Sequence, residues 1–233
     1  MGYLDIEASN VFMGASGVTG PVVYVIDAPE HPFDLTVIAR DRAVTLVSIP
    51  VSNWGASLTP WQAPALYRGE DDYRGEAAKT LAELCSKAIP ELEASACLTP
   101  TARAICGYSL GGLFALYGLT HANAFEACAC LSGSVWYEGW VDHLRSLDLD
   151  LTGHYAFLSV GTKEKHGPRP IMRTVQVNME ECARILQNKG CSVRYRTGPG
   201  NHMSHIPERY AAGIDALEEF LLTQQQEKSH MVH

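Results

Sequence analysis

The sequence has few charged residues, no long run of basic residues and no long apolar run. Charged residues make up 19% of the 233 residues, and the formal net charge is −8. Nucleic acids and anionic membrane surfaces attract clustered lysines and arginines, which this chain lacks. No apolar stretch approaches the roughly 20 residues that a transmembrane helix needs. We therefore expect no nucleic-acid partner and no membrane partner.

Two further features are missing, a basic N-terminal region and paired cysteine motifs. Asp5 and Glu7 stand close to the N-terminus, so this segment does not read as a signal peptide. The seven cysteines are an odd number, and none belongs to a C-x-x-C pair. Free thiols are typical of a reducing compartment, which predicts a cytoplasmic protein. Nothing in the sequence indicates a metal or an organic cofactor.

The chain alternates segments with strand character and segments with helical character. Strands are expected at residues 21–27, 43–49, 102–107, 126–131, 155–161 and 191–197. Helices are expected at residues 33–41, 75–89, 110–120, 171–189 and 206–222. Nearly continuous apolar strands separated by helices predict an α/β fold with a mostly parallel sheet covered on both faces. The length fits one domain over residues 1–223, and residues 224–233 are expected to form a flexible tail.

One loop that follows a predicted strand carries the pattern G-x-S-x-G. Gly107, Ser109 and Gly111 stand between the strand at 102–107 and the helix at 110–120. This is the nucleophile-elbow arrangement, in which a sharp turn exposes the serine hydroxyl and small residues let strand and helix approach. The helix N-terminus would favour an oxyanion beside the serine. The pattern predicts Ser109 as a catalytic nucleophile; the alternative is a glycine-rich turn with a structural role.

A serine hydroxyl needs a base and an orienting acid, which follow it along the chain in this arrangement. His202 is the expected base, because it lies in a loop rich in glycine and proline after the last strand, and His205 is the alternative. Glu164, at the end of the strand at 155–161, is the expected acid, although its lysine neighbours also fit a solvated charge cluster. Asp142 is the alternative acid, and a Ser-His dyad stays open.

An acyl-transfer site also needs two N–H donors for the oxyanion. One is expected from Leu110, the residue after the nucleophile. The other should come from the loop that follows the strand ending at Asp27. Pro29 has no N–H, so the donor is either Ala28 or Glu30, and we favour Ala28.

Aromatic residues gather in the loops expected at the same edge of the sheet. Tyr108 adjoins the nucleophile, and the long loop at residues 51–73 is the one sizeable lid candidate. Large aromatic side chains at this edge predict the walls of a pocket for an apolar or aromatic acyl or alcohol group; the alternative is core packing. Besides Tyr108, the expected substrate-binding residues are the four tryptophans, Trp54, Trp61, Trp136 and Trp140.

With these motifs assembled, the chain resembles the putative-esterase branch of the α/β-hydrolase superfamily. That branch includes siderophore (enterochelin) esterases, esterase D and mycolyltransferases. The resemblance covers residues 20–222. In the segment at residues 53–61, the chain is similar to small cytoplasmic bacterial members of the branch. Its main carriers are the segments at 107–112, 131–136, 161–164 and 199–202.

The resemblance implies an α/β-hydrolase fold without a large cap domain. It also implies the roles already assigned to Ser109 as nucleophile, His202 as base and Glu164 as acid. The chain departs from the branch where the usual Asp-Gly after the oxyanion strand is Asp27-Ala28. A second departure is that only about 20 residues precede the fold, where some siderophore esterases carry an N-terminal domain.

The expected function is a serine hydrolase that cleaves carboxylic ester bonds of a small-molecule substrate through an acyl-enzyme on Ser109. An acyltransferase, a thioesterase or a peptidase would use the same triad. A non-catalytic binding module on the hydrolase fold is the alternative from another class. The sequence leaves the substrate open, and it leaves the oligomeric state open, a homo-oligomer included.

Overall fold

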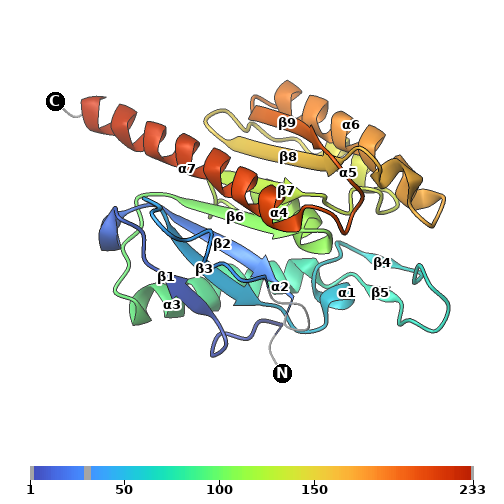
Figure 1. Cartoon of the computed structure of the whole chain (residues 1–233), viewed down its shortest axis with the longest axis horizontal. Helices are drawn as coiled ribbons and strands as arrows, with labels where there is room; N and C mark the ends of the chain where they lie inside the picture. Colours follow the sequence, from blue (N-terminus) through green and yellow to red (C-terminus); the bar gives the residue numbers. More distant parts are fainter. Residues whose placement is uncertain (1–2, 29–32, 232–233) are drawn as a thin grey trace.

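A seven-stranded sheet forms the centre of the protein in the computed structural model, which describes residues 3–28 and 33–231 (Figure 1). The strand order is β1-β3-β2-β6-β7-β8-β9. Among the described strands of this sheet, β1 alone pairs antiparallel with its neighbour. The strands are β1 (Asn10–Phe12), β2 (Val22–Asp27), β3 (Thr45–Pro50), β6 (Arg103–Tyr108), β7 (Ala127–Leu131), β8 (Tyr155–Gly161) and β9 (Ser192–Gly198). The mostly parallel sheet expected from the sequence is confirmed.

Helices cover both faces of the sheet, unequally. The helices are α1 (Trp54–Ser57), α2 (Ala77–Glu83), α3 (Ile89–Ser95), α4 (Leu110–His121), α5 (Trp140–Ser146), α6 (Val175–Asn188) and α7 (Ile206–Met231). Short turns of 3-10 or π type are η1 (Gly17–Thr19), η2 (Leu84–Ala88), η3 (Glu164–His166) and η4 (Ile171–Thr174). On one face, α4 packs on β6 and β7, and α6 packs on β8 and β9. On the other face, α7 packs on β6, β7 and β8 (Figure 1).

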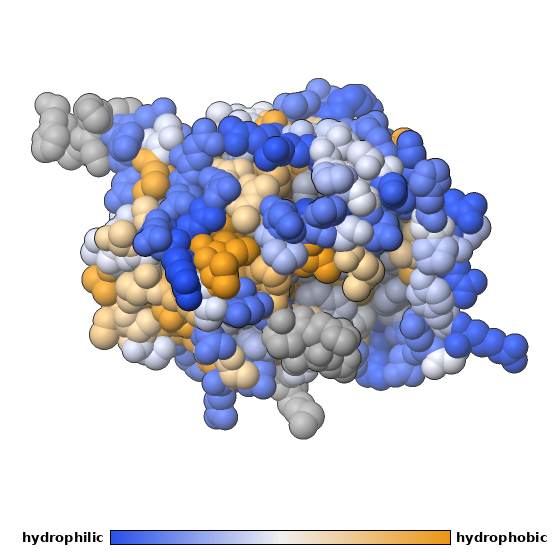
Figure 2. All heavy atoms as spheres, in the orientation of Figure 1, coloured by the Kyte–Doolittle hydropathy of each residue, from blue (hydrophilic) through white to orange (hydrophobic). Residues whose placement is uncertain are grey.

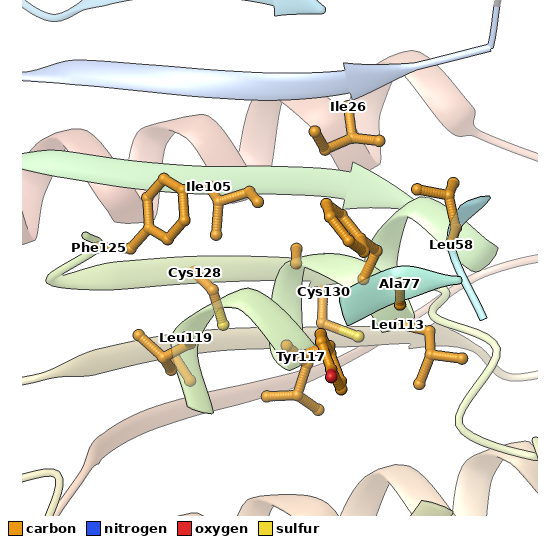
Figure 3. Packing of buried hydrophobic residues seen from close by; sticks show 14 of the residues in the cluster. Ile26, Leu58, Ala77, Ile105, Leu113, Tyr117, Leu119, Phe125, Cys128 and Cys130 are labelled. Atoms are coloured by element: carbon orange, nitrogen blue, oxygen red, sulfur yellow. The ribbon is translucent and has the colours of Figure 1, made fainter. Parts of the chain in front are cut away.

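The apolar runs of the central strands supply a core to each face, because successive side chains of a strand point to opposite sides. On β2, Tyr24 and Ile26 belong to one core, and Val23 and Val25 belong to the other. Figure 3 shows the first core, where Ile105 of β6 and Cys128 of β7 lie close to side chains of α4. Strands buried on both faces need this continuous hydrophobicity, which explains the pattern in the sequence.

The segment at residues 33–41 was expected to be helical, and it forms turns at 35–41 instead. Asp34 accepts hydrogen bonds from both the N–H and the hydroxyl of Thr36, and the Ala39 N–H donates to the Leu35 carbonyl as in a helix. The backbone then leaves the helical region at Asp41, whose φ of 59° is left-handed. The helix prediction was therefore wrong here.

Two helices run past their expected ends. The helix expected at 75–89 continues as α2, η2 and α3 to Ser95, and Pro90 is tolerated because it lies in the first turn of α3 next to a π-turn. The last helix, expected at 206–222, continues to Met231. Gln, Glu and Lys are good helix formers, and Gln224 donates to Glu227 one turn on.

The loop at residues 51–73 contains structure that the sequence did not predict. Besides α1, it holds a hairpin of β4 (Gln62–Ala63) and β5 (Tyr73–Arg74). The hairpin projects beyond the end of the sheet in Figure 1. Its connecting loop contacts the segment after β8, because the Arg169 guanidinium lies 4.8 Å from the centre of the Tyr67 ring.

The surface is mixed in polarity. Figure 2 shows hydrophilic residues over much of one face, with hydrophobic patches near its centre and at one end. Within the described ranges, no helix has both the length and the apolar character needed to cross a membrane.

Candidate active site

The turn between β6 and α4 holds Ser109 in a strained backbone conformation. Ser109 has φ 58° and ψ −122°, which side chains with a Cβ atom rarely adopt. Its N–H donates to Leu131 of β7 at 3.0 Å, and its carbonyl accepts from Leu113 at 3.1 Å. A Cβ atom on Gly107 would collide with the carbonyl oxygen of Gly111, so the strand and the helix can approach only because this residue is glycine.

Three side chains from three different strand ends meet at this turn. Ser109 Oγ lies 3.0 Å from His202 Nε2. His202 Nδ1 lies 2.9 Å from Glu164 Oε2. His202 comes from the loop between β9 and α7, and Glu164 opens η3 directly after β8. The structure therefore brings together the three residues that the sequence analysis selected as nucleophile, base and acid.

The alternative base and the alternative acid lie elsewhere. The side chain of His205 is 47% exposed and lies 3.9 Å from Glu208 in the next turn. The side chain of Asp142 is 84% exposed and pairs with Arg145 on the same helix. Neither residue contacts Ser109 within the described part of the chain.

Glu164 is buried, and both of its carboxylate oxygens accept hydrogen bonds. It is 5% exposed, and its Oε1 accepts from Ser132 Oγ at 2.7 Å and from the Gly161 N–H at 2.7 Å. Burial raises the pKa of this carboxyl, but the hydrogen bond to His202 and those from Gly161 and Ser132 outweigh it, so the pKa lies below its usual range. An ionised carboxylate can accept the Nδ1–H of His202, which leaves Nε2 free to receive a proton from Ser109.

Arg209 of α7 completes the surroundings of the acid. It is only 6% exposed, and its Nη1 donates to Glu164 Oε1 at 3.0 Å, to Ser132 Oγ at 2.6 Å and to Tyr108 Oη at 2.7 Å. A buried guanidinium needs such partners, because an unpaired buried charge is strongly destabilising.

The same guanidinium also holds the loop that carries His202. Arg209 Nη2 donates to the carbonyls of Pro199 at 3.0 Å and Asn201 at 3.1 Å. Tyr108 Oη donates to the carbonyl of His202 at 2.6 Å. Arg209 was not predicted as a site residue, because one arginine in an amphipathic helix carries no signal that it is buried.

The oxyanion donors are only partly as expected. Leu110 is the first residue of α4, where an N–H has no partner within the helix. Ala28 lies at the site, but its N–H donates to Asp27 Oδ1 at 2.9 Å and so is already engaged. Glu30, the alternative donor, lies outside the described residues. Asp27 is 5% exposed, and burial raises the pKa of its carboxyl despite the bonds that it accepts.

Two cavities include His202 in their walls, and Ser109 lines the larger of the two. The larger, here called the aromatic cavity, has a volume of about 430 Å³. Its walls include Ser109, His202, Phe33, Trp54, Tyr108 and Tyr210. The smaller, here called the Lys163 cavity, has a volume of about 220 Å³. Its walls include Glu164, His202, Trp136, Lys163, His166 and Met172.

Of the four tryptophans, two line a cavity at the site and two do not. Trp54 lines the aromatic cavity and Trp136 lines the Lys163 cavity, as expected of pocket walls. Trp140 is fully buried in the core at the start of α5, and Trp61 stacks on it at a centroid distance of 6.5 Å. Neither lines the aromatic cavity or the Lys163 cavity. The substrate-binding prediction was wrong for Trp140, because the unexpected helix α5 turns it into the core, and for Trp61 it stays a prediction. Tyr108 lines the aromatic cavity.

The described ranges contain no cluster of three or more histidine, cysteine or acidic side chains placed to hold a metal ion. All seven cysteines are unpaired. Burial raises the pKa of Cys106, Cys128 and Cys130, which keeps these thiols protonated and unreactive.

Comparison with known proteins identifies relatives over most of the chain. The model of a family described as "Putative esterase" matches residues 10–205. The uncharacterized protein YbbA of Bacillus subtilis is 27% identical over 180 residues, which cover 73% of this chain and 72% of that protein.

Solved structures share the fold. An IroE-like serine hydrolase from Shewanella oneidensis superposes with a TM-score of 0.75 at 18% identity, covering 91% of this chain and 75% of the other. The siderophore hydrolase EstA from Aspergillus nidulans gives a TM-score of 0.68 at 19% identity, covering 94% and 95%. These superpositions confirm the α/β-hydrolase fold.

Proposed function

Because the chain belongs to the putative esterase family of the α/β-hydrolases, we propose that it cleaves carboxylic esters through an acyl-enzyme on Ser109. The observation that supports this proposal best is the continuous hydrogen-bonded line from Ser109 Oγ through His202 to Glu164, with lengths of 3.0 Å and 2.9 Å. Hydrogen bonds of this length allow the proton transfer that a serine nucleophile needs.

In the proposed acylation step, Ser109 Oγ attacks the ester carbonyl carbon while His202 Nε2 takes its proton. Glu164 accepts the hydrogen bond from Nδ1–H and stabilises the imidazolium. The Leu110 N–H at the start of α4 binds the oxyanion of the tetrahedral intermediate, and the helix N-terminus adds a partial positive charge there. The bond from the carbonyl carbon to the alcohol oxygen then breaks, and His202 gives its proton to the departing alcohol.

Deacylation repeats these steps with water. His202 removes a proton from a water molecule, which attacks the acyl carbon of the ester to Ser109. The carboxylic acid is released, and Ser109 recovers its proton from His202. Neither half of the cycle requires a metal or an organic cofactor.

The substrate is proposed as a small-molecule ester. The aromatic cavity, with Phe33, Trp54, Tyr108 and Tyr210 in its walls, fits a flat or aromatic group of that ester. One structural relative is named a siderophore hydrolase, but an identity of 19% carries only the fold across. Acyl transfer, thioester cleavage and peptide cleavage would use the same three residues, Ser109, His202 and Glu164. Competition between water and added acyl acceptors distinguishes transfer from hydrolysis.

We further propose that the protein works in the cytoplasm, which the seven unpaired cysteines support.

Ser109→Ala tests the proposed mechanism directly. The wild-type protein is expected to hydrolyse p-nitrophenyl butyrate and to be labelled by a fluorophosphonate probe. Ser109→Ala is expected to lose the label and about 10³-fold or more of kcat, because no other group replaces the nucleophile. Ser134, whose hydroxyl lies 3.4 Å from that of Ser109, provides the matched control. Ser134→Ala should keep the label, and full activity in Ser109→Ala would overturn the mechanism.

A further inference from the structure

Positively charged side chains are concentrated in the segment that follows β8, although the whole chain carries a net charge of −8. Between residues 163 and 173 the one acidic residue is Glu164, which is buried against His202. The positively charged or titratable residues there are Lys163, Lys165, His166, Arg169 and Arg173. Because Glu164 is committed to His202, the exposed part of this segment is cationic.

This cationic segment reaches the catalytic groups. Lys163 and His166 line the Lys163 cavity together with Glu164 and His202. The rest of the wall is largely apolar, with Trp136 among its members. A group that enters this cavity is therefore next to His202 and within the reach of a lysine.

The lysines and arginines of the segment are not neutralised. Within the described ranges, no ion pair includes any of them. Arg169 lies over the ring of Tyr67, and Arg173 Nε donates to the Gly167 carbonyl at 3.0 Å. Both contacts leave the positive charge in place.

The loop that joins β4 to β5 contacts the cationic segment through Tyr67 and Arg169, and this loop also carries three acidic residues. They are Glu70, Asp71 and Asp72. Asp72 Oδ1 accepts from the Ala65 N–H at 2.9 Å within the hairpin itself. None of the three forms an ion pair with the cationic segment in the residues that the structure describes. The cations thus remain available to a ligand.

The aromatic cavity has the reverse character. Among the described residues of its wall there is no lysine or arginine, and the one acidic side chain is the buried Asp27. A carboxylate there disfavours a second negative charge. An ester with one apolar half and one anionic half would therefore lie across Ser109 in a single orientation.

We propose that the Lys163 cavity is the subsite for an anionic group, a carboxylate or a phosphate, carried by the ester that Ser109 attacks. This inference rests on the proposed function. Lys163 supplies a charge-assisted hydrogen bond to the anionic oxygen, and the neighbouring cations raise the local concentration of anionic esters. Neutral esters react at the same serine without this contribution.

An acyl pair of substrates tests the subsite. The mono-p-nitrophenyl ester of adipate and p-nitrophenyl hexanoate share the leaving group and the chain length, and they differ in the terminal carboxylate. We expect Lys163→Gln to lower the ratio of their kcat/KM values about 5- to 10-fold, because one charge-assisted hydrogen bond is lost. Lys87→Gln is the matched control, since Lys87 is exposed on η2 and lines neither cavity. It should leave the ratio unchanged.

An alcohol pair covers the other half of the ester. The acetate esters of 4-hydroxybenzoate and of its methyl ester differ in one charge on the leaving group. A fall of the anionic-to-neutral ratio in Lys163→Gln in either pair supports the subsite, and an unchanged ratio in both overturns it. Inhibition by free adipate or by inorganic phosphate, weakened in Lys163→Gln, shows which anion is preferred. Failure of wild type to hydrolyse any of the esters would count against the proposed function instead.

Discussion

Each residue of the proposed triad is held in place by a different structural feature. Ser109 is fixed by a strained turn, and Glu164 by burial among hydrogen-bond donors. His202 lies in a loop, and its position depends on Arg209, which binds the carbonyls of Pro199 and Asn201 just before it. Loops are usually the mobile parts of a fold, so a buried guanidinium that pins two carbonyls is a physical reason for an ordered base.

Arg209 is therefore expected to act as a positioning residue. Arg209→Met should lower kcat about 10- to 100-fold with a smaller change in KM, because a misplaced base slows the chemical step more than substrate binding. Arg209→Lys keeps the charge but not the forked geometry, so it should recover part of the loss. Kinetics on p-nitrophenyl butyrate together with thermal unfolding of each variant provide the measurement. Equal kcat in Arg209→Met and wild type would contradict the assignment.

Among the secondary-structure elements, the turn from β6 to α4 has the tightest requirements. Gly107 closes against the carbonyl of Gly111, and Gly112 lies against Gly133 of the next loop. These contacts are between backbones, which cannot move aside as a flexible side chain can. The glycines of the G-x-S-x-G pattern are therefore required by the close packing of β6 against α4.

Gly107→Ala should therefore destabilise the fold by about 3 kcal/mol, the upper end of the usual range for overpacking. Gly198→Ala on β9 is the control, because a Cβ atom there meets nothing within 4 Å and the φ angle is not positive. It should change the free energy of unfolding by less than about 0.5 kcal/mol. Urea unfolding of both variants checks this expectation, and equal stability of the two would show that the turn can relax.

At the scale of the whole molecule, the sheet gathers the ends of β6, β8 and β9 at one edge (Figure 1). Ligands bind at this carboxyl edge in parallel α/β sheets. The single long helix α7 covers the second face over β6 to β8 and carries Arg209 into the site. The stability of the whole fold is therefore coupled to the ionisation of the buried acid.

This coupling gives a pH dependence with a definite sign. The pKa of Glu164 is lowered in the folded protein, so its contribution to stability is present above its unfolded pKa of about 4.3 and is lost as pH falls through the folded pKa. Glu164→Gln cannot titrate at this position. The difference in free energy of unfolding between wild type and Glu164→Gln should therefore narrow from about pH 6 to about pH 3, measured by urea unfolding. The raised pKa of Asp27 acts in the opposite direction but is common to both proteins. A constant difference across this range would show that Glu164 is not bonded as described.

Local sequence patterns were sufficient for the six parallel strands of the central sheet, for most helices and for the selection of Ser109, His202 and Glu164, but not for β1, β4 and β5. Each of these correct predictions depends on neighbours in the chain: continuous hydrophobicity for a strand buried on both faces, glycine spacing for a tight turn, and chain order for the base and the acid. The helix predicted at 33–41 was wrong, because the backbone turns into the left-handed region at Asp41.

The tertiary structure alone determined which side chains surround these residues and which of them are buried. Trp54 faces a cavity and Trp140 faces the core because of how α1 and α5 pack, and the sequence around the two tryptophans does not show this packing. The burial of Arg209, and the meeting of Lys163 with His202 at one cavity, follow from elements that are distant in the chain and adjacent only in the fold. Side-chain burial is a property of packing between elements, so a single sequence determines the parts of this site, and the fold determines their surroundings.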